Sequence, residues 1–191
     1  MYQRQNLMSM QKGKMVQNRR ICYIMGNMER NTFVINAITE ALLDLLQIKS
    51  LNSISIGEIT TRANVSRNSF YRNFSSKEDI IRLRIRTYLN QWSSLTSDQN
   101  SDPKEIFAQL FTIAEQHKNF FLILKNADLL YLLQDEFFKN YGPSEEDDEV
   151  SAYAKAFFAY STYGFLETWI KRGMKQTAED MKNMLKNTDN H

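Results

Sequence analysis

The sequence predicts an all-α fold, and three observations support this prediction. The 191-residue chain contains only two prolines and six glycines, while helix-forming residues are abundant. Several stretches repeat apolar residues at intervals of three and four, the period of an amphipathic helix. Ser or Thr followed three residues later by Glu or Asp precedes several of these stretches, as it does at helix N-termini. With 42% hydrophobic and 24% charged residues, the chain is long enough for a sizeable core and for one or two domains.

The first predicted helix runs from Asn31 or Thr32 to about Ile48. Its apolar residues recur at helical spacing: Val34, Ile35, Ile38, Ala41, Leu42, Leu45 and Leu46. We expect this strongly amphipathic helix to cover the inward faces of the two helices that follow, with residues 49–54 as the connecting loop.

The stretch from Ser55 to Phe74 predicts two short helices joined by a tight turn. Ser55 and Glu58 have the spacing of a capping box, so a helix begins near Ile56. Asn64 stands where this helix must end with a positive φ, a conformation that Asn adopts more readily than other non-glycine residues.

The second of these helices is capped by Ser66, and its Phe70 and Phe74 lie four residues apart and face inward. Its outward residues are rich in hydrogen-bond donors: Arg67, Asn68, Ser69, Arg72 and Asn73. Arg and Asn are the side chains that read guanine and adenine when a helix enters the major groove of DNA. An ordinary solvated helical hairpin has the same pattern, so spacing alone leaves both interpretations open.

The same segment resembles the DNA-binding helix-turn-helix of the TetR/AcrR family of transcriptional regulators. The matching residues are Ile56, Ile59, Ala63, Val65, Ser66, Ser69, Phe70, Tyr71, Phe74, Ser76, Lys77, Glu78, Asp79 and Ile80. The resemblance implies an N-terminal three-helix DNA-binding head and a C-terminal helical body that binds a ligand and dimerises. It also implies that the DNA contacts come from Thr61, Arg62, Ser66, Arg67, Asn68, Ser69, Tyr71, Arg72, Asn73 and Lys77.

Three asparagines of this segment depart from the family pattern. Asn64 and Asn68 stand where Gly is usual or frequent, and Asn73 stands where His is common. These three positions therefore offer different side chains for base and phosphate contacts than the family pattern does.

Charge is distributed unevenly along the chain. Residues 1–95 carry 14 Lys or Arg against 6 Asp or Glu, a net charge of +8, whereas residues 96–191 carry 10 against 16, a net charge of −6. A basic half suits contact with DNA phosphates, and an acidic half discourages it. The single Cys22 excludes an intramolecular disulfide and suits the cytoplasm, and no uninterrupted apolar run predicts a membrane span.

Residues 1–28 are basic, polar and without helical periodicity, so we expect them to be disordered when free. Two interpretations stay open. The segment is a basic arm that contacts the duplex, or the natural chain begins at Met25 or Met28.

A further helix start follows Phe74. Ser75 and Glu78 repeat the capping-box spacing, and the predicted helix runs to about Leu95. Lys77 and the helix amides are predicted to bind a phosphate. In the family such a helix links the head to the body. Three arginines of this helix are either phosphate contacts or solvated side chains: Arg82, Arg84 and Arg86.

The C-terminal half begins after a polar boundary at residues 93–101. Asp102 and Pro103 open a helix, and residues 119–141 hold one or two more, stopped by Gly142. The five acidic residues 145–149 predict a solvated loop.

The stretch 150–172 is apolar on nearly every face, so both of its sides must be covered. One side can face its own body and the other a second subunit. Gly173 ends this helix, and Thr177 with Asp180 caps a last one. The pair resembles the two helices that form the dimer interface in the family, which implies homodimer contacts from Phe158, Phe165, Trp169, Met181, Met184 and Leu185.

A small-molecule effector pocket in the body is also implied by the resemblance, and fifteen Phe, Tyr and Trp residues from residue 99 onward are enough to line one. Core packing explains the same residues, so both interpretations stay open for the candidates Trp92, Phe111, His117, Tyr131 and Tyr160. The sequence contains no metal-ligand spacing, nucleophile elbow or glycine-rich phosphate loop, so it favours no enzymatic activity, and we expect no cofactor.

The sequence thus predicts a basic extension over residues 1–28, a helix-turn-helix DNA-binding domain over 29–76 and a regulatory and dimerisation domain over 77–191. The predicted function is that of a repressor released from a palindromic operator on double-stranded DNA by an effector bound in the body. The alternatives are a related regulator controlled by a protein partner and a helical interaction protein without DNA binding.

Overall fold

The computed structural model describes residues 29–95 and 103–187, with side chains from 105 to 184 in the second range. Within these ranges the chain forms α-helices, one short 3-10 helix and no strand, so the predicted all-α fold is confirmed. The expectations for residues 1–28, for Asp102 and for the side chain of Leu185 lie outside the described part.

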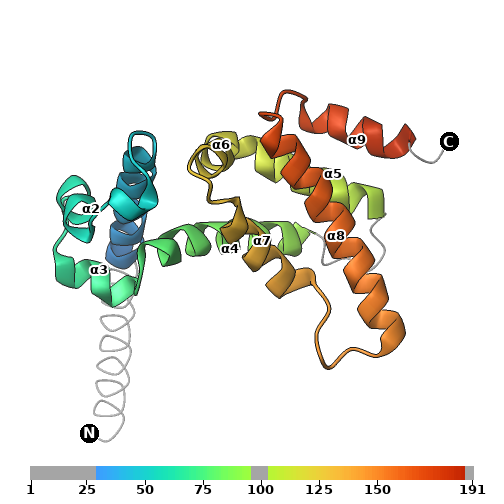
Figure 1. Ribbon diagram of the computed structural model, residues 1–191, viewed down its shortest axis with the longest axis horizontal. Helices are drawn as coiled ribbons and strands as arrows, with labels where there is room; N and C mark the ends of the chain where they lie inside the picture. The colour runs from blue at the N-terminus through green and yellow to red at the C-terminus, as the bar shows by residue number, and fades with distance from the viewer. Residues whose placement is uncertain (1–28, 96–102, 188–191) are drawn as a thin grey trace, which may run out of the picture.

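The N-terminal helices gather at one end of the molecule (Figure 1). They are a first helix over residues 29–46, the 3-10 helix η1 (Leu51–Ser53), α2 (Ile56–Arg62) and α3 (Arg67–Asn73). Ile38 and Leu42 of the first helix, Ile59 of α2 and Phe70 of α3 are fully buried. The first helix therefore covers the inward faces of α2 and α3, as predicted, and we call these elements together the head.

Helix α2 begins at the predicted capping box. The backbone N–H of Ser55 donates to Oε2 of Glu58 at 2.9 Å, and the N–H of Glu58 donates to Oγ of Ser55 at 3.2 Å. Lys49 forms an ion pair with the same carboxylate. These bonds, from Lys49 first and then from Ser55, lower the pKa of Glu58 from its ordinary value of 4.5 to about 2.

The turn after α2 has the predicted left-handed residue. Asn64 has a φ of 52°. The N–H of Asn64 donates to the carbonyl of Thr61 at 3.2 Å, and that of Val65 donates to the carbonyl of Thr60 at 3.0 Å. This pair of bonds is the Schellman arrangement, which satisfies the last carbonyls of α2 and turns the chain toward α3.

Helix α4 (Lys77–Leu95) runs from the head into the body (Figure 1). Its predicted cap is wrong by one residue. Oδ2 of Asp79, not the carboxylate of Glu78, accepts the N–H groups of Ser75 at 3.0 Å and Ser76 at 2.9 Å, and the N–H of Asp79 donates to Oγ of Ser76. Because the helix begins at Lys77, Ser76 occupies the cap position, and the carboxylate that can reach back is three residues after it.

The body contains α5 (Pro103–Gln116), α6 (Lys118–Asn126), α7 (Leu130–Tyr141), α8 (Glu149–Lys171) and α9 (Ala178–Asn187). The predicted stretch 119–141 is two helices, because Asp128 ends α6 with a φ of 58°. Gly173, with a φ of 86°, follows α8, and Thr177 and Asp180 cap α9 reciprocally as predicted. None of the helices in the described residues is long and apolar enough to span a bilayer.

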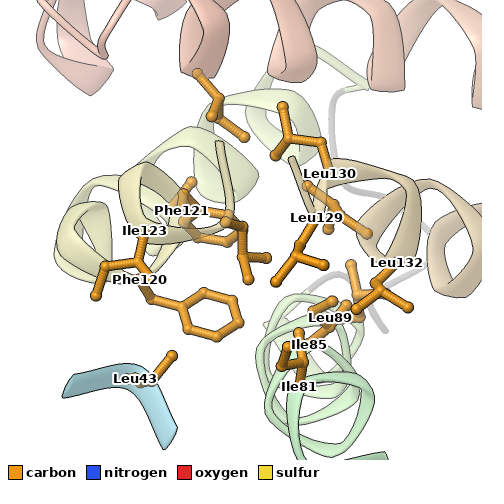
Figure 2. Packing of buried hydrophobic residues seen from close by; sticks show 14 of the residues in the cluster. Leu43, Ile81, Ile85, Leu89, Phe120, Phe121, Ile123, Leu129, Leu130 and Leu132 are labelled. Atoms are coloured by element: carbon orange, nitrogen blue, oxygen red, sulfur yellow. The ribbon is translucent and has the colours of Figure 1, made fainter. Parts of the chain in front are cut away.

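Within the body, α4 packs against α5 and α7, α7 packs against α8, and α5 packs against α9. The buried apolar residues form one connected cluster that runs from the head into the body. Figure 2 shows Leu43 of the first helix beside Phe120 of α6, with Ile81 and Ile85 of α4 below Leu129. The head therefore shares its core with the body through α4 and α6.

Replacing Glu58 with Gln tests the capping box of α2. Gln keeps the capping geometry but removes the charge, so the stability that depends on the lowered pKa is lost. Ionised Glu58 contributes above its unfolded pKa, and the contribution disappears as the pH falls from about 4.5 toward about 2. Thermal unfolding at neutral pH should show a lower midpoint for the variant, and the two midpoints should converge as the solution is acidified. A difference that does not depend on pH would contradict this assignment.

Candidate nucleic-acid interface

Helix α3 divides its side chains between the core and the surface. Phe70 and Phe74 are buried, whereas Arg67, Asn68 and Arg72 are exposed. Tyr71 is also exposed, and the edge of its ring packs on Phe70 with ring centroids 5.4 Å apart. The structure therefore brings most of the predicted donors to the solvent side of one short helix.

Three other predicted residues of this segment have partners within the head. Oγ of Ser66 accepts the N–H of Ser69 at 3.0 Å and lies 2.9 Å from Oγ of Ser69. Nδ2 of Asn73 donates to the carbonyl of Ser69 at 2.8 Å. Ser66, Ser69 and Asn73 thus help to shape α3, and Asn73 keeps its amide oxygen for other contacts.

Gly57 is a residue of this surface that the sequence reasoning missed. A Cβ atom at position 57 would lie 2.9 Å from Nη2 of Arg67, closer than real Cβ atoms approach. The Arg67 guanidinium thus occupies the space beside Gly57, and as the end of a flexible side chain it would have to shift to accommodate a Cβ atom there. The available indication in the sequence was the glycine itself, because Gly is less favourable than Ala in a helix and a glycine there can indicate that a neighbouring group lies close.

Thr61 and Arg62, at the end of α2, are both exposed, and Arg62 pairs with an acidic residue. Nη2 and Nε of Arg62 donate to Oδ2 of Asp44 at 2.9 and 3.1 Å, and both side chains are about half exposed. An exposed pair of this kind contributes little and exchanges its partners easily. The guanidinium of Arg62 therefore lies against the first helix in this structure, in a pair that other partners can replace.

Lys77 has partners that the sequence analysis did not anticipate. Its ammonium donates to the carbonyl of Leu51 at 2.6 Å and to that of Ile54 at 2.7 Å. These carbonyls belong to η1 and the residue after it, so Lys77 ties the loop before α2 to the start of α4. Since an ammonium has three N–H donors, one remains for the predicted phosphate contact.

The first helix contributes two further polar residues to this surface. Arg30 and Asn31 line a hollow together with Ser69, Arg72 and Asn73 of α3. The helix begins at residue 29, before the predicted start at Asn31 or Thr32, and its first residues lie on this surface while later ones lie in the core. Helical spacing back from Val34 was the available signal, because it places Asn31 and Arg30 one turn earlier on the same side.

All three arginines of α4 form ion pairs with acidic side chains. Arg84 pairs with Glu40 of the first helix at 3.1 Å. Arg82 and Arg86 both pair with Glu136 of α7. Arg84 therefore attaches α4 to the head, and Arg82 and Arg86 attach it to the body.

The predicted effector-pocket residues do not surround one cavity. Trp92 and Phe111 are buried in the core, and Nε1 of Trp92 donates to the carbonyl of Ile106 at 2.8 Å. Tyr131 and Tyr160 are exposed and line different open hollows: Tyr131 lies beside a hollow between α7 and α8, and Tyr160 lies beside the groove between α8 and α9 and beside a hollow next to α7.

His117, the fifth candidate, lies at the junction of α5 and α6. Its ring stacks on Tyr88 of α4 with centroids 3.9 Å apart. Burial, followed by the positive charge of Arg84, lowers the pKa of His117 below its ordinary value. His117 is therefore part of the packing between α4 and the body.

The residues predicted for a dimer interface divide into two groups. Phe165 and Met184 are partly exposed along a groove of about 500 Å³ between α8 and α9, and Trp169 and Met181 are buried at its base. Phe158 points the other way, because its ring packs on Trp92 and Phe107 in the core.

Two family comparisons cover most of the chain. Residues 38–82 match the family described as "Bacterial regulatory proteins, tetR family", and residues 101–190 match "Transcriptional regulator C-terminal region". The first match contains the whole of α2 and α3 together with the start of α4.

Individual proteins agree with these matches. The chain is 27% identical over 117 residues to the HTH-type dhaKLM operon transcriptional activator DhaS of Lactococcus lactis, a match that covers 58% of this chain and 60% of that relative. A TetR transcriptional regulator from Streptococcus agalactiae has the same fold, with a TM-score of 0.55 and 20% identity over 84% of this chain and 96% of that one. A TetR-family regulator from Syntrophomonas wolfei is similar, with a TM-score of 0.53 and 21% identity over 83% and 91% of the two chains. The chain therefore belongs to the TetR family and is a DNA-binding transcriptional regulator.

Proposed function

We propose that this regulator binds a palindromic operator as a homodimer and that α3 of each subunit enters the major groove. The observation that carries the proposal is the two-sided character of α3: the phenylalanines Phe70 and Phe74 lie in the core, and Arg67, Asn68 and Arg72 lie exposed on the other side. Arg binds guanine and Asn binds adenine through paired hydrogen bonds in that groove.

Positively charged residues around α3 support the same orientation on DNA. Arg30 of the first helix lies beside Arg72 at the hollow between the two helices. Lys77 keeps one N–H donor beyond its two carbonyl partners. We assign Arg30 and Lys77 to phosphates on either side of the groove, where such contacts fix the orientation of a reading helix.

The dimer is proposed on the exposed face of α8. Val150, Tyr153, Phe157 and Tyr160 follow one another at intervals of three and four along this helix, and Phe157 is 79% exposed. This spacing is that of a helix-packing seam. The seam continues into the groove between α8 and α9, where Phe165 and Met184 stand. A second copy of the chain would cover this continuous apolar surface.

We propose repression, with release when an effector bound in the body alters the tilt of α4. In a dimer that tilt sets the distance between the two α3 helices, which must match half-sites about 34 Å apart. Because the operator DNA is in the cytoplasm, we propose that the regulator is cytoplasmic.

A second candidate is control by a protein partner, and one observation favours it. The hollow lined by Tyr131, which lies outside the proposed dimer interface, is an open groove rather than an enclosed pocket. The relative DhaS is described as an activator, and activation is therefore the alternative to repression. A reporter gene behind the chain's own promoter, measured with and without the regulator, distinguishes repression from activation.

Replacing Arg72 with Ala tests base reading. If Arg72 binds a base edge, affinity for the preferred sequence should fall by about 1–3 kcal/mol and discrimination at one operator position should relax. Electrophoretic mobility-shift titration against the promoter DNA and against single-base variants measures both effects. Lys139→Ala, on the exposed side of α7, is the control. Unchanged affinity and unchanged discrimination in the Arg72 variant would contradict the role.

Replacing Arg30 with Ala tests the phosphate contact. Affinity should fall by a similar factor for all sequences, and the salt dependence of binding should become shallower by about one ion. Lys77→Ala should show the same change and also a lower unfolding temperature, because Lys77 holds two backbone carbonyls of the head. A sequence-dependent loss for Arg30→Ala would place that side chain on a base instead.

Replacing Phe165 with Glu tests the dimer. A charge placed in an apolar interface should weaken association by about 2 kcal/mol or more, roughly 30-fold in the dissociation constant. Sedimentation velocity over a range of concentrations measures the change. Ile48→Glu, at an exposed hydrophobic residue after the first helix, is the matched control and should leave the dimer intact. A wild-type chain that sediments as a monomer would contradict the proposed interface.

A further inference from the structure

Helix α4 is attached firmly to the head at its N-terminal end. Lys77 donates to the carbonyls of Leu51 and Ile54, and Arg84 pairs with Glu40 of the first helix. Ile80 and Ile81 are buried in the shared core. The head and the first turns of α4 therefore move together.

Two turns of the same helix carry the attachment to the body. Nη1 of Arg86 donates to Oε1 of Glu136 at 3.0 Å, and Nη1 of Arg82 lies 3.4 Å from the same oxygen. Nη2 of Arg82 donates to Oδ2 of Asp135 at 2.8 Å. Arg82 and Arg86 are one helical turn apart, so a single carboxylate on α7 receives both.

Glu136 is the buried member of this group. Its side chain is 3% exposed, whereas Arg82 and Arg86 are 27% and 41% exposed. A buried carboxylate needs compensating charge and hydrogen bonds, since without them it would remain uncompensated in the core. If α4 slid or tilted along α7, Glu136 would lose Arg82 and Arg86. The buried carboxylate therefore favours one orientation of α4 over slightly different orientations.

A second contact between the same helices strengthens the attachment. The hydroxyl group of Tyr141 on α7 donates to the carbonyl of Leu89 on α4 at 3.1 Å. Together with the two arginines, it fixes α4 at several points along its length.

We propose that Glu136 is a positioning residue for DNA binding: by holding Arg82 and Arg86 it fixes the angle of α4 against the body and thereby the distance between the two α3 helices of the dimer. The inference rests on the proposed binding of a palindromic operator by a homodimer. Glu136 contacts no DNA, and its effect is on the separation of half-sites rather than on the sequence of each half-site.

Selection from a randomised duplex DNA library tests this role, because it reports half-site sequence and spacer length separately. The wild type should select an inverted repeat with one preferred spacer. Glu136→Gln, which keeps the shape and removes the charge, should select the same half-site with a spacer that is shifted or broadened by one base pair or more. Its affinity for the wild-type repeat should fall about tenfold or more, and its affinity for a single half-site should not change.

Three further variants complete the test. Arg86→Ala leaves the Arg82 contact in place, so it is the milder variant if Glu136→Gln fails to fold, and it should shift the spacer in the same way. Arg86→Lys restores a charge beside Glu136 and should recover the wild-type spacer. Glu105→Gln removes an ion pair between α5 and α9 that does not involve α4, and should change nothing.

The outcomes separate the two proposals. A folded Glu136→Gln variant that selects the wild-type spacer with wild-type affinity would overturn the positioning role alone. An equal loss for the single half-site and for the repeat would also overturn it, because a general loss of structure acts on both. A wild type that selects no two-fold-symmetric sequence would overturn the proposed function and this inference together.

Discussion

Burial of α4 is the constraint on which the two halves of this chain depend. The helix buries Ile80 and Ile81 at its start and Leu89 and Trp92 toward its end, so one helix supplies core residues to the head and to the body. Separating either half from α4 would expose apolar surface to water, at a free-energy cost of about 25 cal/mol for each Å² exposed. The apolar packing does not specify one orientation of α4, and the polar contacts of the helix do. Lys77 and Arg84 hold the head, and Arg82 and Arg86 hold the body through Glu136.

This arrangement lets a short recognition helix work. Seven residues are too few for a helix that is stable by itself. Helix α3 is instead specified by the cap at Ser66, by the turn at Asn64 and by Phe70 and Phe74 in the core. Its outer side chains are therefore presented on a rigid support, and the Arg67 guanidinium occupies the space beside Gly57.

Local features of the fold could be predicted from the sequence, and distant partners could not. The caps at Ser55 and Thr177 and the turn at Asn64 depend on residues within a few positions, so their spacing was enough. The cap of α4 was misplaced by one residue because Glu78 and Asp79 both follow a serine at the right spacing. Helix α8 is apolar on nearly every face, so the spacing of its apolar residues did not indicate which of them face the core. Phe158, predicted at the dimer interface, faces the core instead. The partners of Lys77 and the buried state of Glu136 depend on residues 23 to 54 positions away.

Chemical protection of guanine N7 tests most directly whether α3 reads bases in the major groove. N7 lies in the major groove, so dimethyl sulfate reports that groove alone on guanine. With the full-length regulator bound to its promoter DNA, we predict two patches of protected guanines about one helical turn apart and related by two-fold symmetry. Bound DNA whose guanine N7 atoms all stay reactive would contradict the account.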